Sequence, residues 1–190
     1  QDPSPAARAG AVRRLSAQAT AALTPRRWPL LLDSEHRHGF LHRLDVPCSG
    51  LILVAKTYEA YYDLQFQLVL GELVRDYLVL CHGWLALARE WVCARIFWSK
   101  ADCLPSLILE QGKPSRTRFF TLRHTQRGGQ AFSLLAARLG SGRRHQIRAH
   151  AAHLGHPLAA DGRYAGVETL RRDRQWCPRV SLHRCRLCFR

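Results

Sequence analysis

Compact apolar runs bounded by turn residues recur along this 190-residue chain and predict the strands of a sheet. Each run is short and is flanked by glycine, serine or charged residues, which is typical of strands buried in a core. The runs cover residues 51–55 (LILVA), 76–81 (DYLVLC), 116–122 and 132–139. The pair Gly128-Gly129 lies between the last two runs and predicts a turn there.

Apolar residues spaced three and four apart predict helices between these strands. The predicted helices cover residues 12–23, 57–69 and 144–154. Thr57 is placed to cap the second helix, and Gly155 with Pro157 ends the third. Strands and helices alternate without a fixed period, which predicts an α+β fold.

The stretch 84–110 has no clear helical or strand period. Its three tryptophans, Trp84, Trp91 and Trp98, are expected to mark a face of the core.

Positive charge is concentrated in the second part of the chain. Lys and Arg number 29 against 14 acidic residues, and residues 114–190 alone hold 16 Arg against three acids. This distribution indicates a nucleic-acid partner, although an Arg-rich codon bias would produce the same composition. No apolar run is long enough to cross a bilayer, so we expect no membrane-spanning segment.

Seven scattered cysteines indicate reduced, buried thiols of an intracellular protein rather than a disulfide framework. His150, His153 and His156 are spaced three apart, but no acidic residue or cysteine accompanies them. Cys185 and Cys188 lack a second pair at zinc-finger spacing and are interpreted as core thiols. We therefore expect no metal site.

The first 27 residues are rich in Ala and Arg, with Asp2 as the one acid. An organelle-targeting peptide has the same composition, and we hold that as the weaker interpretation. Met is absent from the sequence, so we expect the chain to be a piece of a longer protein.

Three segments combine charge with turn residues in a way that suits chemistry. His42-Arg43-Leu44-Asp45 precedes the run 51–55 and would bring a carboxylate to a sheet edge. Arg75-Asp76-Tyr77 opens a predicted strand with a ring that can stack on an unstacked base. Residues 142–150 (GRRHQIRAH) begin a helix with guanidinium groups that suit phosphates or a carboxylate. Taken singly, Arg43 and Asp45 could form a surface ion pair, and Tyr77 could reflect only the preference of tyrosine for strands.

Taken in order, these segments resemble the RluA-type RNA pseudouridine synthases. The family pattern HRLD…SGLLLVAKT is matched at residues 42–57, and the strand pattern K-x-Y-x-A-x-V-x-G at residues 75–83. The pattern G-R-T-H-Q-I-R-V-H-x-A-x-x-G-H-P-I-x-G-D-x-x-Y-G is close to residues 142–166. The ending R-x-x-L-H-A-x-x-L-x-F resembles residues 179–189. An ordered set of motifs is far more specific than any one of them.

The resemblance implies a mixed, mainly antiparallel central sheet flanked by helices and loops, the pseudouridine synthase fold. It implies an N-terminal helical segment and loop over residues 1–35, followed by a catalytic region over 36–190. The family's first strand and the end of its last strand are not recognisable, so we expect a catalytic domain truncated at both ends.

The resemblance also implies roles for individual residues. Asp45 would be the nucleophile toward a uridine flipped out of the RNA, and Arg148 would form the ion pair that keeps Asp45 ionised. Tyr77 would pack on the uracil and assist proton removal. The residues implied as RNA contacts are Arg43, which would fill the gap left by the flipped uridine, Leu44, Arg143, Arg144, His145 and Gln146. Leu51 or Ile52 would form an apolar wall of the pocket.

The implied activity is isomerisation of uridine to pseudouridine in ribosomal or transfer RNA by a monomer without cofactor or metal. The chain departs from the family patterns at Cys48, Arg144 and Ala160. These departures and the missing first strand keep open a second hypothesis, a catalytically inactive RNA-binding relic of the same fold. A third, a metal-binding basic protein, rests only on the numbers of His and Cys.

Overall fold

The computed structural model describes residues 15–45, 47–86, 91–99 and 104–189. Contacts divide the chain into two units. Unit 1 comprises Gln1–Val46, Leu51–Leu73 and Cys188–Arg190, and unit 2 comprises Pro47–Gly50 and Val74–Leu187. The predicted organisation into 1–35 and 36–190 stays a prediction.

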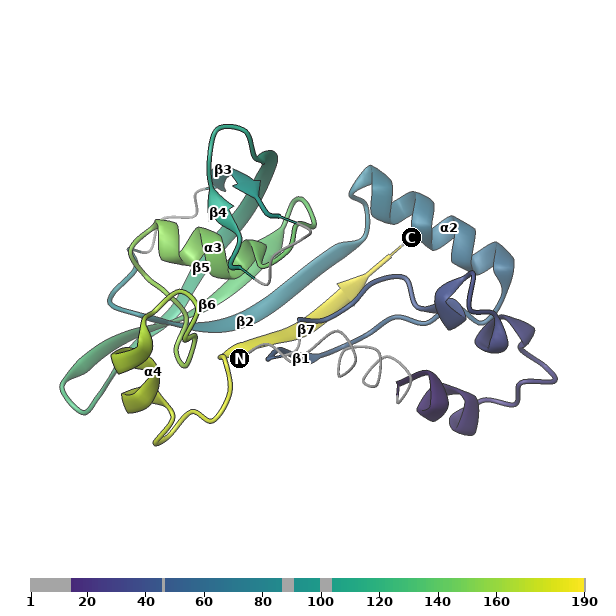
Figure 1. The fold of residues 1–190 in the computed structure, drawn as a ribbon, viewed down its shortest axis with the longest axis horizontal. Helices are drawn as coiled ribbons and strands as arrows, with labels where there is room; N and C mark the ends of the chain where they lie inside the picture. Colours follow the sequence, from purple (N-terminus) through teal and green to yellow (C-terminus); the bar gives the residue numbers. More distant parts are fainter. Residues whose placement is uncertain (1–14, 46, 87–90, 100–103, 190) are drawn as a thin grey trace. The chain divides into compact units, whose positions relative to one another are not determined.

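Unit 1 is built from helices. A helix over 15–22 and the short 3-10 helices η1 (Pro29–Leu32) and η2 (Arg37–Gly39) precede α2 (Tyr58–Leu70) (Figure 1). The Thr57 side chain accepts a hydrogen bond from the Ala60 amide at 3.2 Å, and Gly71 ends α2 with a φ of 78°. The core of unit 1 consists of Leu30, Leu41, Ala55, Tyr61 and Leu64.

A mixed sheet organises unit 2. Its seven described strands run in the order β1-β7-β2-β6-β5-β3-β4 (Figure 1). They are β1 (Ser49–Gly50), β2 (Val74–His82), β3 (Trp91–Phe97), β4 (Leu107–Ile108), β5 (Lys113–Arg127), β6 (Gln130–Leu139) and β7 (Leu182–Cys188). The β2–β6, β5–β6, β3–β5 and β3–β4 pairs are antiparallel, whereas β1 and β7 are parallel. The predicted α+β fold with a mixed, mainly antiparallel sheet is confirmed.

Helices follow the sheet in unit 2. Helix α3 (Gln146–His153) contacts β3, β4 and β5, and α4 (Val167–Asp173) follows in the chain (Figure 1). The core lies on the α3 side, where the members with the largest side chains are Tyr77, Phe119, Leu135, Ile147, Leu158 and Leu182. None of the described helices is long and apolar enough to cross a membrane.

Most of the predicted elements are confirmed, with shifted ends. β2, β5 and β6 contain the runs 76–81, 116–122 and 132–139, and α2 and α3 correspond to two predicted helices. The predicted helix 12–23 is helical over 15–22, and its first three residues lie outside the described part of the chain.

The strand predicted at residues 51–55 is wrong. The segment is extended, but along it the described residues form one isolated bridge, between Phe40 and Val54. Leu51 is 49% exposed. An apolar run makes a strand only when a neighbouring strand offers a ladder of backbone partners. Here the parallel partner β7 pairs two residues earlier, at Ser49–Gly50.

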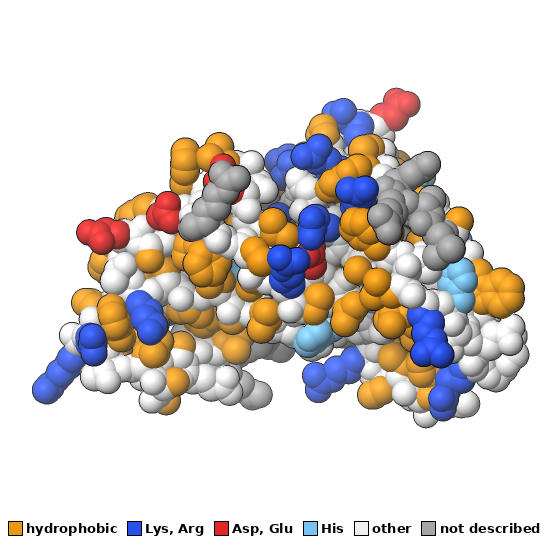
Figure 2. Space-filling view, turned by 180° about the vertical axis from the view of Figure 1, so that it is seen from behind, with side chains coloured by type: hydrophobic (Ala, Val, Ile, Leu, Met, Phe, Trp, Pro, Cys, Tyr) orange, Lys and Arg blue, Asp and Glu red, His pale blue; other side chains and the backbone are white. Residues whose placement is uncertain are grey.

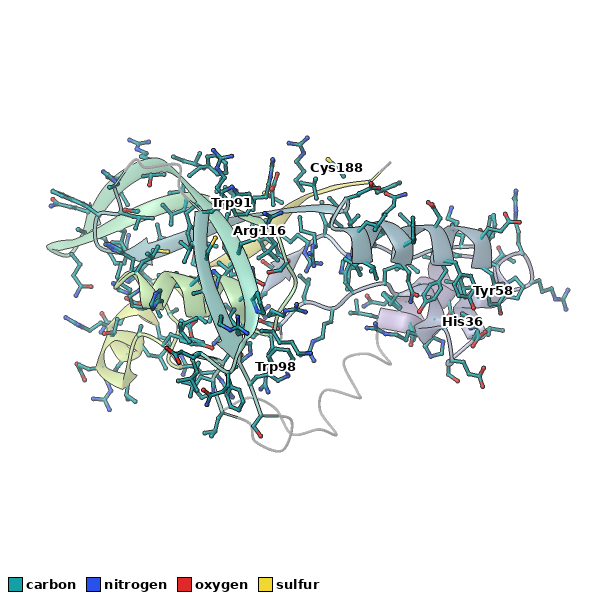
Figure 3. All side chains as sticks on the ribbon, turned by 90° about the horizontal axis from the view of Figure 1, so that it is seen from above. His36, Tyr58, Trp91, Trp98, Arg116 and Cys188 are labelled. Carbon is teal, nitrogen blue, oxygen red and sulfur yellow. The ribbon has the colours of Figure 1, made fainter. Side chains whose placement is uncertain are left out.

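The predicted tryptophan core face is also wrong for Trp84 and Trp91. Trp84 is 58% exposed and stacks on the His124 ring, with the ring centroids 6.2 Å apart. Trp91 is 38% exposed, and the Arg116 guanidinium lies over its ring at 5.1 Å (Figure 3). Stacking on the His124 ring and on the Arg116 guanidinium, rather than core packing, therefore places these two rings.

The cysteines are less buried than predicted. Among the described cysteines all are free thiols, but only Cys81 is buried, and Cys185 is exposed rather than a core thiol.

On the face in Figure 2, Lys and Arg side chains lie among hydrophobic ones, with few acidic groups between them.

Candidate active site

Tyr77 lies on β2 with its ring on the buried side of the sheet. Successive strand residues point to opposite faces, so Arg75, Tyr77 and Val79 share the buried face. Asp76 and Leu78 lie on the other face. Tyr77 is 5% exposed and belongs to the unit 2 core. Its position thus follows from the strand period of its own segment.

The Tyr77 hydroxyl accepts two hydrogen bonds from the Arg184 guanidinium on β7. Nε lies 2.8 Å and Nη2 2.6 Å from the phenol oxygen, and the guanidinium carbon lies 5.1 Å from the ring centroid. Burial raises the pKa of Tyr77, while the Arg184 and Arg75 charges lower it. The pKa remains above its ordinary value, so the phenol is protonated at neutral pH.

Arg75 brings a second buried guanidinium close to Tyr77. Burial lowers the pKa of Arg75, the charge of Tyr77 raises it and the charge of Arg184 lowers it. A Cβ at Gly142 would lie 2.6 Å from Nη1 of Arg75. The turn before α3 therefore lies against the end of the Arg75 side chain.

The turn before α3 is held together by Gln146. Its Oε1 accepts hydrogen bonds from Ser141 Oγ at 2.9 Å and from the Arg143 amide at 3.0 Å. Its Nε2 donates to the Arg116 carbonyl at 2.8 Å and to Thr117 Oγ1 at 2.9 Å. Gln146 is 2% exposed. The geometry therefore gives Gln146 a structural task inside the chain.

The other predicted RNA contacts of this turn differ in exposure. His145 is 6% exposed, and its Nδ1 lies 3.3 Å from the Tyr164 hydroxyl. Arg143 and Arg144 are half-buried. The two arginines are therefore more exposed than His145 and Gln146.

Arg148 forms a bidentate ion pair with Asp161 in the interior of unit 2. Nε lies 2.7 Å from Oδ2 and Nη2 lies 2.7 Å from Oδ1. Arg148 is 2% exposed and Asp161 has no exposed surface. The Tyr164 ring lies 5.2 Å from the guanidinium carbon. Planar fork geometry of this kind fixes the guanidinium in direction as well as in charge.

The remaining predicted site residues belong to unit 1. Arg43 is exposed, Leu44 and Asp45 are half-buried, Leu51 is exposed and Ile52 is half-buried. Tyr77 and Arg148 belong to unit 2. The structure thus brings Tyr77, Arg75 and Arg184 together, and Arg148 with Asp161, while the pairing of Asp45 with Arg148 stays a prediction.

Sequence reasoning did not identify Arg184 and Asp161 as partners of site residues. Alternation along β7 places Leu182 and Arg184 on one face, and this period is visible in the sequence. The residue that Arg184 contacts, Tyr77, lies 107 positions away in the chain, so local periodicity does not reveal the contact.

No three His, Cys, Asp or Glu side chains within the described ranges group as metal ligands would. The chemistry that the unit 2 residues can perform is that of an aromatic ring flanked by fixed guanidinium groups. The ring and both guanidinium groups are buried in unit 2.

A family model described as RNA pseudouridylate synthase matches residues 22–153, which include Asp45, Tyr77 and Arg148. The chain is 35% identical over 134 residues to the uncharacterized RNA pseudouridine synthase YlyB of Bacillus subtilis. That match covers 70% of this chain and 43% of the relative. Ribosomal large subunit pseudouridine synthase D of Nitrosomonas europaea is 40% identical over 134 residues. That match covers 70% of this chain and 37% of the relative. The chain therefore spans about two fifths of the length of these curated relatives.

Solved structures show the same fold. Human RNA Pseudouridylate Synthase Domain Containing 1 superposes with a TM-score of 0.69 at 28% identity, over 78% of this chain and 62% of that one. Human RNA Pseudouridylate Synthase Domain Containing 4 gives a TM-score of 0.63 at 17% identity, over 84% of this chain and 72% of that one. These likenesses confirm the fold that the sequence resemblance implied.

Proposed function

This chain belongs to the RNA pseudouridylate synthase family, in its RluA-type branch, and we propose that it isomerises uridine to pseudouridine in RNA. The observation that carries the proposal is the family match over residues 22–153, which contains Asp45, Tyr77 and Arg148 in order. Curated relatives are named for the ribosomal large subunit, so large-subunit ribosomal RNA is the proposed substrate.

In the proposed mechanism, the target uridine leaves the base stack and Asp45 acts as the nucleophile, forming a bond to the uridine that breaks again before the product is released. The N1–C1′ bond breaks, the base turns, a C5–C1′ bond forms, and C5 loses its proton while N1 gains one. All atoms stay within the uridine apart from these protons, so the reaction needs no oxidant, reductant or other cofactor. Tyr77 would pack on the uracil and, once its own phenol proton has left, assist removal of the C5 proton.

Arg148 is proposed to keep Asp45 ionised. Asp161 accepts two hydrogen bonds from Arg148 and fixes the direction of its guanidinium. A carboxylate beside such a fixed cation stays ionised when bound RNA excludes water. Asp161 would orient Arg148 without taking part in the reaction.

RNA contacts are proposed for Arg43, Leu44, Arg143 and Arg144, with Arg43 filling the gap left by the flipped uridine. Leu51 and Ile52 would form the apolar wall beside the base. We further propose that the protein works as a monomer inside the cell, where its RNA substrate lies.

The direct test is tritium release from RNA that carries uridine labelled at C5. The 190-residue chain is expected to release tritium, whereas Asp45→Ala should release none above background because the nucleophile is lost. Glu168→Gln removes an exposed carboxylate on α4 and is the matched control, expected to release tritium as the wild type does.

Equal release by wild type and Asp45→Ala would remove Asp45 from the mechanism. No release from either, with RNA binding retained in a filter assay, would favour the inactive RNA-binding relic.

A further inference from the structure

Arg184 occupies a position from which it controls the hydrogen bonding of Tyr77. It is 4% exposed, and its two hydrogen bonds to the phenol oxygen are short, at 2.8 and 2.6 Å.

The backbone of Arg184 is held on both sides. Its strand β7 lies between β1 and β2 in the sheet, and Gly50 of β1 pairs with Arg184. A Cβ at Gly50 would lie 2.6 Å from the Arg184 amide nitrogen, and Gly50 has a φ of 116°, which favours glycine. The close approach of β1 thus fixes the backbone position from which the Arg184 side chain extends.

Hydrogen-bond chemistry then determines the state of the Tyr77 hydroxyl. Guanidinium has donors and no acceptor, so the phenol oxygen must accept both hydrogen bonds. The phenol proton is thereby directed away from Arg184 and toward any third group.

We propose that Arg184 is a positioning residue for Tyr77: its guanidinium fork holds the phenol oxygen and favours departure of the phenol proton. The proposal rests on the proposed function for its catalytic consequence, because Tyr77 is the residue assigned to proton removal. Burial opposes ionisation of Tyr77, and the charge and hydrogen bonds of Arg184 act in the opposite direction.

The first test measures the titration of Tyr77 directly by NMR of ring-labelled tyrosine, with Tyr77→Phe identifying its signal. Arg184→Ala should raise the pKa of Tyr77 relative to wild type, because the charge and both hydrogen bonds are lost. Arg184→Lys should give an intermediate pKa, since it keeps a charge but not the planar fork. Arg186→Ala, which removes an exposed guanidinium from the same strand, is the matched control and should leave the pKa close to wild type.

A Tyr77 pKa that is unchanged or lowered in Arg184→Ala would overturn the proposal. If Arg184→Ala does not fold, Arg184→Lys decides: a Tyr77 pKa equal to that of wild type would equally overturn it.

The second test uses tritium release in a double-mutant cycle. Arg184→Ala should lower kcat about tenfold with little change in KM when Tyr77 is present. In the Tyr77→Phe background, the same change should alter kcat less than about twofold. Equal losses in both backgrounds would assign Arg184 a merely structural role. A wild-type chain that releases no tritium, with the Tyr77 titration as expected, would refute the proposed function and leave the positioning of Tyr77 intact.

Discussion

His150 on α3 has no exposed surface, and its surroundings oppose a charge on the ring. Burial lowers the pKa of His150 to about 4, the backbone of Ala94 raises it, and the charge of His153 lowers it. An unfolded chain would bind this proton at about pH 6.5. The unfolded state therefore binds more protons between pH 4 and 6.5, and stability falls as the pH drops through that window.

Replacing His150 by a side chain that does not titrate should weaken this pH dependence. We expect the free energy of unfolding in urea to fall less between pH 7 and pH 5 for His150→Asn than for wild type. His124→Asn, which removes an exposed histidine on β5, is the matched control. Equal losses of unfolding free energy in wild type and His150→Asn would show that His150 is not the group that causes the pH dependence.

At the scale of elements, α2 illustrates how a local signal specifies a helix end. The Thr57 hydroxyl accepts the Ala60 amide, one of the amides that have no partner within the helix. Thr57→Ala should therefore destabilise α2 by about 1 kcal/mol, measured as faster hydrogen exchange of the α2 amides. Thr57→Ser keeps the oxygen and should keep the protection; loss of protection in Thr57→Ser as well would show that the cap is not the cause.

At the scale of the whole molecule, the excess of Arg over acidic residues should make RNA binding depend on salt. Each phosphate contact with single-stranded RNA contributes about 0.7 to the slope of log affinity against log salt concentration. Arg143→Ala combined with Arg144→Ala should reduce that slope by about 1.4, as measured by fluorescence anisotropy. The matched pair Arg171→Ala and Arg172→Ala on α4 should change it less. A salt-independent affinity in the wild type would contradict an electrostatic RNA interface.

Local pattern and ordered motifs were enough to predict the fold class, most strands, α2 and α3, and the family. The period of β2 also placed Tyr77 on a buried face without knowledge of its neighbours. These features depend on residues close together in the chain, because side-chain direction in a strand or helix repeats with a fixed period.

The tertiary structure alone decided which segments pair and which buried groups meet. The run 51–55 has the composition of a strand but pairs with no ladder among the described residues, and Trp91 lies under Arg116 because their strands are neighbours. Tyr77 receives the Arg184 guanidinium from 107 positions away. Sequence determined the elements and the family because both are encoded over short spans. Pairing, burial and the hydrogen bonds of the site depend on contacts between distant segments, which local periodicity does not encode.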